Sequence, residues 1–540
     1  MKKTALLFLT LLALLVLFTS CTNDIDAPDC SWDEVFLQYW NAMNTEYVHF
    51  SEDASYDWDK VYEEYLPKFK ALDYTKAEDS IKAFKYFKEI AVGVHDNHYN
   101  LTVKDGLGNT LATSPAMLTK YAASGGDIMD FPDVKIAGLL GESLVTINHP
   151  DDEVSAEALR KIYKQTIPSI FEVENLIKGK DITDEKASGG GGDATYGYFH
   201  STEGDIATEF PDGAFYGYTF VSFTKEEIAK FDEKDDQIIA AIWNYVIKEL
   251  GIESYFYGVN KDNIFYLYFS DFGNPLYLTD LFTKEEADLT PEEKELIANN
   301  SDIKNIRFYT RWLLDDAKDI KDEDLKAKIE KGIDGIIGIQ KMYATLNSVV
   351  SKDEWAVNET VTKKDFKGVI VDLRGNGGGA VAFLSSIWGL FFKDETQFGY
   401  VRYKAGYSRL EYTPWTSFSL AKDYTNEELE ANYAKPVAVI VNGYSVSCSE
   451  ISCVIAKLLE KSAIVGHTTF GGTCALSDRT VFNSGPFTSE HLNIYTTTYQ
   501  FVNMEKKSFE TTGIEPDIAT ELDPKKDNAY IAAVDWVKTK

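Results

Sequence analysis

The chain of 540 residues contains a glycine-rich stretch directly after a short apolar run. The run Phe366–Asp372 leads into Asp372-Leu-Arg-Gly-Asn-Gly-Gly-Gly379, in which four of the last five residues are glycine. Glycines let the backbone approach a ligand closely and turn its N–H groups inward. The stretch lacks the Gly-Lys-Ser/Thr ending of a P-loop and the spacing of a dinucleotide fingerprint. We therefore expect a loop that holds a negatively charged oxygen, as an oxyanion hole or a phosphate cradle.

A second stretch places serines at the expected junction of a strand and a helix. The apolar run 437–442 is followed by Gly443-Tyr-Ser-Val-Ser-Cys-Ser-Glu450 and then by an amphipathic pattern. A serine at this position usually caps the helix. It is also where nucleophiles are placed, because the helix N-terminus and its free N–H groups stabilise negative charge. These residues alone leave both interpretations open.

Two further motifs follow, Gly466-His-Thr-Thr-Phe-Gly-Gly472 and Gly513-Ile-Glu-Pro-Asp-Ile518. In this order the four motifs resemble the tail-specific (C-terminal-processing) and tricorn-like serine proteases. The resemblance is strong over residues 365–520, weaker over 32–101 and poor over 102–252. It implies an α/β fold, with a mixed-sheet protease core of the ClpP/crotonase-like kind, an N-terminal helical domain and an intermediate domain. It also implies peptide-bond hydrolysis without a metal or an organic cofactor.

The resemblance assigns the nucleophile to the middle serine of the serine motif, Ser447. A serine hydroxyl needs a base that accepts its proton. One branch of the family uses a lysine at the position where this chain has Gly472, so a serine–lysine dyad is absent. The tricorn-like branch uses a histidine in an Asp-Gly-His motif, which Asp96-Asn97-His98 resembles. We therefore predict His98 as the general base, with His95 and His467 as the alternatives.

The resemblance also supplies the partners of the serine and the base. Glu510, three residues before Gly513, is predicted to orient the imidazole, with Glu505 as the alternative. The backbone N–H groups of Gly378 and Cys448 are predicted to form the oxyanion hole.

Three residues of the glycine loop have polar side chains that we expect to brace the loop rather than react. They are Asp372, Arg374 and Asn376.

The periodicity of apolar residues indicates which elements hold these motifs. Spacings of three and four predict helices within 35–43, 58–66 and 81–90. Short runs rich in β-branched residues predict strands near 263–272, 366–372, 437–442 and 463–466, and an amphipathic helix lies between the last two. Strands that alternate with helices indicate an α/β layer architecture.

The length favours several domains, because a chain of 540 residues exceeds one compact core. The predicted order is a signal peptide (1–20), a lipidated tether (21–31), an N-terminal helical domain ending in the histidine motif (32–101), an intermediate domain (102–252) and the catalytic core (253–540). Whether the intermediate domain is a PDZ-like peptide-binding module is left open.

The N-terminus predicts export. Two lysines precede an apolar run over 4–18, which is too short for a comfortable membrane span and suits a signal peptide. Small residues before Cys21 resemble a bacterial lipobox, so we expect lipidation of Cys21 and a location in the cell envelope, in the periplasm or at the outer membrane surface. A bridge such as Cys448–Cys474 is possible in an oxidising compartment.

The composition limits the partners. The formal net charge is -32, and no basic stripe is visible, which argues against binding to nucleic acid. A polypeptide substrate is the expected partner, and the oligomeric state is not predicted. The alternative to an enzyme is a catalytically inactive protein on the same fold that binds peptides or apolar ligands, since fold does not fix function.

Overall fold

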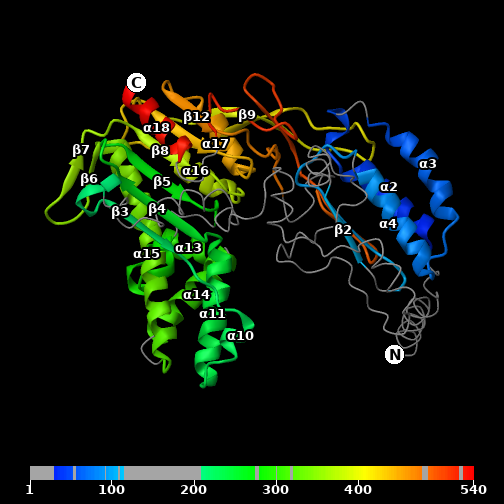
Figure 1. The fold of residues 1–540 in the computed structure, drawn as a ribbon, viewed down its shortest axis with the longest axis horizontal. Helices are drawn as coiled ribbons and strands as arrows, with labels where there is room; N and C mark the ends of the chain where they lie inside the picture. The colour runs from blue at the N-terminus through cyan, green and yellow to red at the C-terminus, as the bar shows by residue number, and fades with distance from the viewer. Residues whose placement is uncertain are drawn as a thin grey trace, which may run out of the picture.

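The computed structural model describes residues 30–52, 56–91, 93–107, 110–114, 208–273, 279–299, 301–316, 320–476, 485–521 and 527–540. The predicted signal peptide, Cys21 and most of the predicted intermediate domain lie outside the described residues. Figure 1 shows an N-terminal helical unit on one side and a larger sheet-based core on the other.

The N-terminal unit consists of helices over a small sheet. The helices are α2 (Trp32–Glu46), η2 (His49–Ser51), α3 (Trp58–Lys70) and α4 (Ala77–Ala91). α2 begins where the sequence provides a capping box, in which the side chains of Ser31 and Glu34 each bond the backbone N–H of the other. The three α-helices lie where the apolar periodicity predicts them, and their aromatic residues fill a core of their own.

The small sheet of this unit contains strands from distant parts of the chain. Its order is β13 (Phe487–Thr488), β14 (Leu492–Tyr495), β1 (Asn100–Lys104) and β2 (Thr110–Thr113). β1 pairs antiparallel with β14, with Leu101 opposite Ile494. The segment that follows the histidine motif is therefore held by the C-terminal part of the chain.

The larger core is built on a seven-stranded mixed sheet. Its order is β16 (Ile518–Ala519), β12 (Ser462–Gly466), β11 (Val437–Val441), β8 (Val369–Asp372), β5 (Phe265–Phe269), β4 (Ser254–Val259) and β3 (Phe215–Thr219). The five neighbouring strands β16, β12, β11, β8 and β5 are parallel to one another. The strands β5, β4 and β3 pair antiparallel. Residues 208–252, which we assigned to the intermediate domain, contribute β3 and the helix α11 (Lys234–Leu250) to this core.

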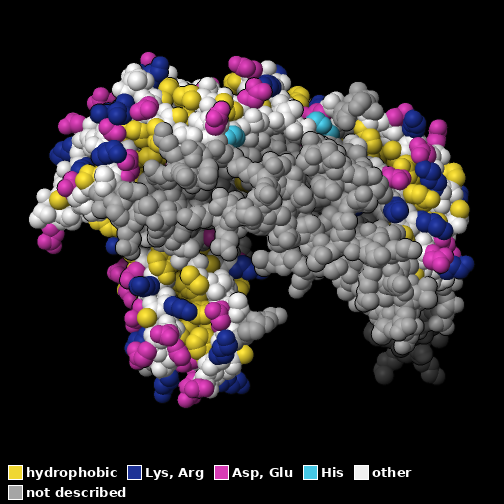
Figure 2. Space-filling model, in the orientation of Figure 1, with side chains coloured by type: hydrophobic (Ala, Val, Ile, Leu, Met, Phe, Trp, Pro, Cys, Tyr) yellow, Lys and Arg dark blue, Asp and Glu magenta, His cyan; other side chains and the backbone are white. Residues whose placement is uncertain are grey.

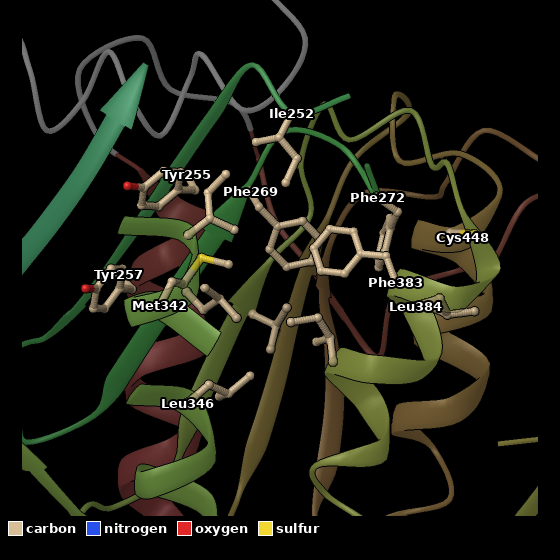
Figure 3. Packing of buried hydrophobic residues seen from close by; sticks show 14 of the residues in the cluster. Ile252, Tyr255, Tyr257, Phe269, Phe272, Met342, Leu346, Phe383, Leu384 and Cys448 are labelled. Atoms are coloured by element: carbon tan, nitrogen blue, oxygen red, sulfur yellow. The ribbon is translucent and has the colours of Figure 1, made fainter. Parts of the chain in front are cut away.

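Alternate side chains of the central strands enter two different cores, as the period of two residues in a strand requires. Val369 and Val371 of β8 lie in the larger core, whereas Ile370 faces α18 (Asn528–Thr539) on the opposite side. The larger core contains residues of α15 (Glu323–Lys352), α16 (Val381–Gly389) and α17 (Cys448–Ala456). Figure 3 shows Phe269, Phe272 and Phe383 of this core close to Leu384 and Cys448.

The remaining elements form an arm and two smaller sheets. The arm that extends from the core in Figure 1 contains α11 and α15 with α10 (Lys225–Ile228), α12 (Thr279–Thr283), α13 (Pro291–Asn299) and α14 (Ser301–Asp316). The sheets are β10 (Thr416–Leu420), β9 (Thr396–Arg402) and β15 (Gln500–Asn503), and the pair β6 (Glu354–Ala356) and β7 (Thr362–Lys364). Single turns of 3₁₀ helix lie at η5 (Pro211–Gly213), η7 (Glu286–Asp288) and η9 (Lys422–Tyr424).

The described part of the face in Figure 2 mixes acidic and basic side chains, without a basic stripe. Within the described residues, none of the helices combines the length and the apolar character needed to cross a bilayer.

Candidate active site

Ser447 lies at the junction of β11 and α17. It is the residue immediately before α17, and its φ of 56° and ψ of −115° place a non-glycine residue in a rarely occupied backbone region. Such a conformation costs on the order of 1–3 kcal/mol and persists only where the surrounding structure imposes it. The sharp turn brings Ser447 to the N-terminal end of the helix, as the sequence predicts.

The other two serines of the motif have structural partners. Ser445 is buried and its hydroxyl donates to the Leu373 carbonyl (2.7 Å). Ser449 is buried and its hydroxyl lies 2.9 Å from both oxygens of Asn376. Ser447 is only half-buried. Burial and bonding therefore single out the middle serine as the candidate nucleophile.

The buried Glu450 carboxylate fixes the turn around Ser447. It accepts hydrogen bonds from the backbone N–H groups of Ser447 (3.1 Å), Gly471 (2.8 Å) and Gly472 (2.7 Å). The Thr469 hydroxyl donates to the same carboxylate at 2.5 Å. Burial raises the pKa of Glu450, and these four hydrogen bonds oppose the shift. Glu450 thus joins the serine turn to the loop 469–472.

The glycine loop is held by the side chains that we expected to brace it. Arg374 is buried and bonds both Asp372 (2.6 Å) and Asp527 (2.8 Å), the residue that caps α18. Asn376 is buried and donates to the Phe269 carbonyl (2.9 Å), while its own carbonyl accepts from the Val446 N–H (3.0 Å). These bonds attach the loop to the core and to the serine turn.

The two predicted oxyanion donors lie beside Ser447. Gly378 has a φ of +95°, and a Cβ there would lie 2.6 Å from the Ser447 Cβ and 3.1 Å from the Cys448 nitrogen, so only glycine fits. Cys448 is the first residue of α17, where a backbone N–H has no partner within the helix. The Gly378 N–H donates to Asn376 Oδ1 (2.9 Å) in this structure and has to leave that bond to serve an oxyanion.

His98 belongs to the N-terminal unit and lies close to the turn that holds Ser447. It lies in the loop between α4 and β1, and its ring packs over Gly472. A Cβ at Gly472 would lie 2.9 Å from His98 Cε1, 3.3 Å from His98 Nδ1 and 3.2 Å from a methyl of Val446, the neighbour of Ser447. The space above Gly472 therefore holds the His98 ring.

The His98 ring is available as a base. Among the described residues, its buried Nδ1 has no hydrogen-bond partner, and no bond joins the Ser447 hydroxyl to the ring. Burial lowers the pKa of His98, Asp96 opposes that shift, and His49 adds to it. A histidine with a lowered pKa is neutral near pH 7, which a general base requires.

Glu510 is buried beside this histidine. One ligand atom each of Asp96, His98 and Glu510 lies within 4.8 Å of the other two. Glu510 accepts from the N–H groups of Asn97 (2.9 Å), Thr473 (2.8 Å) and Cys474 (3.0 Å). Burial and then Asp96 raise the pKa of Glu510 to about 8, whereas His49 lowers it.

The alternatives to His98 and Glu510 lie in other environments. Glu505 is exposed in the turn after β15. The Nδ1 of the His95 ring lies 3.3 Å from the Thr511 hydroxyl oxygen, and the His95 backbone N–H donates to the Tyr47 hydroxyl (2.7 Å). His467 follows β12, and its N–H donates to the Val441 carbonyl (3.0 Å). The structure brings His98 and Glu510 together beside the serine turn, and the roles of these two residues stay predictions.

The cluster of Asp96, His98 and Glu510 has ligand atoms at a spacing that a metal ion requires. Both Asp96 oxygens already accept hydrogen bonds. Oδ1 accepts from the backbone N–H of His98, and Oδ2 accepts from the Thr496 hydroxyl and the Thr497 backbone N–H. Both Glu510 oxygens are bonded to backbone N–H groups. Because the oxygens are engaged in these bonds, we assign no metal ligands here.

Three residues of this region were not identified from the sequence as parts of the site. Glu450 was considered only as part of a helix cap, although a Ser-x-x-Glu pattern signals the reciprocal bonding seen here. Asp96 was noted only as part of the histidine motif. His49 lies 49 residues before His98, and no sequence signal connects it to the site.

Four cysteines lie in the described residues, and all four are free thiols: Cys30, Cys448, Cys453 and Cys474. The bridge Cys448–Cys474 that we considered is therefore not formed in this structure. Burial raises the pKa of Cys448 to about 12, so its thiol is neutral. Cys21, the predicted lipidation site, lies outside the described residues.

Comparison with known proteins relates part of this chain to a family of peptidases. Residues 335–520 match the model of Peptidase family S41. The chain is 26% identical over 182 residues to the carboxy-terminal processing protease CtpA of Bacillus subtilis, an alignment that covers 34% of each chain. It is 28% identical over 163 residues to the tail-specific protease of Haemophilus influenzae, covering 29% of this chain and 21% of the relative. The chain thus spans about a third or less of the length of these curated relatives.

Among solved structures, mature CPAF complexed with lactacystin aligns with 94% of this chain and 97% of that chain, at 10% identity and a TM-score of 0.41. The tricorn protease aligns with 82% of this chain and 40% of its own, at 14% identity and a TM-score of 0.23. The segment matched by the family model contains Ser447, Glu450 and Glu510, whereas His98 lies outside it. The similarity to Peptidase family S41 is therefore carried by residues 335–520 of this chain.

Proposed function

We propose that this protein is an exported serine endopeptidase in which Ser447 is the nucleophile, His98 the general base and Glu510 the acid that orients the base. The observation that carries the proposal is the position of Gly472. The His98 ring and the Val446 side chain lie within 3.3 Å of the place of its missing Cβ, so the base and the serine turn meet over one glycine.

The reaction follows from this arrangement. Ser447 Oγ attacks the carbonyl carbon of the peptide, and its proton passes to His98. The resulting oxyanion is stabilised by the Cys448 N–H and, once it is released from Asn376, by the Gly378 N–H. His98 returns the proton to the leaving amine, which departs and leaves an ester on Ser447. Water, deprotonated by the same imidazole, hydrolyses the ester and restores the hydroxyl.

The substrate class is proposed from the relatives. One curated relative is named a carboxy-terminal processing protease, and the other a tail-specific protease. We therefore propose that the substrate is a polypeptide that is cleaved near its C-terminus. A pair of peptides that differ only in a free or amidated C-terminus tests this point, and equal kcat/KM values for the two would contradict it.

Labelling by a fluorophosphonate probe tests the nucleophile. The wild-type protein should be labelled, and Ser447→Ala should lose both labelling and peptide hydrolysis while it keeps its thermal unfolding transition. Ser489→Ala, a change in a half-buried serine of the N-terminal unit, is the control and should retain both. Absence of labelling in the wild-type protein would refute the proposed function.

Substitution of each candidate histidine tests the base. His98→Ala should lose nearly all activity, about 10²–10⁴-fold, as expected for removal of a general base. His95→Ala and His467→Ala should retain most of it. If either of these variants loses the activity while His98→Ala keeps it, the assignment of the base is wrong.

We further propose that a lipid on Cys21 anchors the protein in the cell envelope, on the strength of the lipobox-like residues before Cys21. Fractionation of cells that express Cys21→Ser tests this anchor. The variant should leave the membrane fraction, and its persistence there would contradict lipid anchoring.

A further inference from the structure

We infer that His49 is a positioning residue for the proposed hydrolysis, a buried imidazolium that keeps His98 a free base and favours the ionised form of Glu510. This inference rests on the proposed function for its consequences in catalysis. It rests on the hydrogen bonds around His49 for its structural part.

A continuous chain of hydrogen bonds links His49 to the histidine loop. His49 is fully buried, and its Nδ1 lies 2.5 Å from a Glu52 oxygen. Its Nε2 lies 2.7 Å from the Thr497 hydroxyl oxygen. The oxygen of that hydroxyl lies 3.1 Å from Asp96 Oδ2. The other oxygen, Asp96 Oδ1, accepts from the backbone N–H of His98 at 2.8 Å.

The directions of these bonds assign the protons. Asp96 is surrounded by four donors, from Thr496, Thr497 and the His98 backbone, and both of its oxygens therefore act as acceptors. The Thr497 hydroxyl has one hydrogen, which Asp96 takes, so the bond to His49 Nε2 needs a hydrogen on the ring. Glu52 takes a hydrogen from Nδ1 in the same way. His49 is therefore protonated on both nitrogens.

The charges that surround His49 support this assignment. Burial lowers the pKa of His49, but Glu52, Asp96 and Glu510 outweigh burial and raise it to about 9. The titratable and charged groups that face the ring directly or through these partners are Glu52, Tyr47, His95, Asp96, Glu510, His98 and Arg402. His49 provides a positive charge among three carboxylates of this buried region.

The charge acts on both neighbours in the direction that catalysis needs. The imidazolium of His49 lowers the pKa of His98, so that the base is free to accept the serine proton. It also lowers the pKa of Glu510, which burial and Asp96 otherwise raise. Without His49, both groups should hold a proton to higher pH, and a protonated Glu510 no longer stabilises an imidazolium at His98.

The pH profile of kcat/KM separates this role from a merely structural one. In His49→Gln the acidic limb should move to higher pH by about one unit or more, the size expected when a nearby charge is removed. Activity at a pH on that limb should fall about tenfold and recover at higher pH. A structural role would lower activity by the same factor at every pH, and an unmoved limb would overturn the inference.

The matched control is His491→Gln. His491 is a half-buried histidine at the N-terminal unit, and its Nδ1 lies 2.8 Å from the Tyr74 hydroxyl oxygen, away from the partners of His49. Its loss should leave the pH profile unchanged. A shift equal to that of His49→Gln would overturn the inference, because the shift would then not depend on the charge at His49.

Nitrogen-15 NMR of labelled histidines in the Ser447→Ala protein provides a readout that needs no activity. His49 should carry hydrogens on both nitrogens at pH 7.5 and titrate only near pH 9. A neutral His49 at pH 7.5 would overturn the inference. If the wild-type protein fails to react with the fluorophosphonate probe, the proposed function fails, while this spectrum still decides the state of His49.

Glu52→Gln serves if His49→Gln does not fold. Glu52 is half-buried, and the substitution removes the carboxylate that accepts the hydrogen on His49 Nδ1. The His49 titration should then fall by about one unit or more. An unchanged titration would show that Glu52 does not hold the charge and would overturn the assignment.

Discussion

Gly472→Ala tests the way in which the base is positioned. The backbone at Gly472 does not have a positive φ, so alanine is compatible with it, and the N–H bond to Glu450 is retained. The added methyl meets the His98 ring most closely, at 2.9 Å from Cε1 and 3.3 Å from Nδ1, and it also meets a methyl of Val446 at 3.2 Å. The substitution therefore displaces chiefly the His98 ring, with a smaller adjustment of the Val446 side chain.

The size of the effect follows from the geometry. Non-bonded carbon atoms come to rest at about 3.5–4.0 Å. The contact of 2.9 Å therefore requires His98 Cε1 to retreat by at least about 0.6 Å. A displacement of about 1 Å in a catalytic group can cost about 10²-fold in rate. We expect kcat/KM to fall by about 10–100-fold, with little change in the thermal unfolding temperature.

The assay is peptide hydrolysis together with the rate of fluorophosphonate labelling, which should fall in parallel. Gly443→Ala is the matched control, because Gly443 lies in the connection between β11 and α17 that holds Ser447, and its added methyl would meet only the Thr468 carbonyl at 3.9 Å. Wild-type activity in Gly472→Ala would refute the argument that the ring occupies this space. Equal losses in both variants would show that the effect is not specific to His98.

Two further predictions concern the buried charges. Glu450→Gln should destabilise the protein by about 1–3 kcal/mol and reduce labelling, because an amide cannot accept from all the donors around it. Urea unfolding measures the loss of stability, and Glu460→Gln, a change in an exposed glutamate, is the control. The pKa values of His49 and Glu510 are raised to about 9 and about 8, so the folded protein holds more protons than the unfolded chain between pH 6.5 and 9. Stability present at pH 6.5 should therefore be lost toward pH 9, by about 3 kcal/mol from His49. Unfolding at both pH values measures the loss, which His49→Gln should reduce; stability that rises over this interval would contradict the argument.

Local patterns predicted much of the fold. Runs of β-branched residues marked β8, β11 and β12, because strands buried on both faces have few polar positions. Apolar spacing marked α2, α3 and α4 for the same local reason. The order of strands in the sheet, and the entry of β3 into it, depend on contacts between distant segments that no local period records.

In the candidate site, too, local motifs could be recognised from the sequence, whereas contacts between distant segments could not. The serine motif and the glycine loop were noticed because each is one continuous motif whose turn chemistry is local, whereas the choice of Ser447 among the three serines came from the resemblance. The contacts of His98 with Gly472 and of Glu510 with Asn97 join residues far apart in the chain. The sequence suggested these partners only through a resemblance. His49 was missed because its role arises from three carboxylates that only the folded chain collects around it.

The neighbours of His98 and of Ser447 belong to separate hydrophobic cores, with Tyr99 in one and Cys448 in the other, and the bond from the Asn97 N–H to Glu510 closes a separation of 413 residues. Contacts of such long range form slowly, since the entropy of closing the chain is lost before they contribute. During synthesis or refolding, the serine turn should therefore form before the histidine reaches it. If Ser447 and His98 act as we propose, a nascent or partly unfolded chain has the serine without its base and cannot cleave neighbouring chains until the two cores have docked.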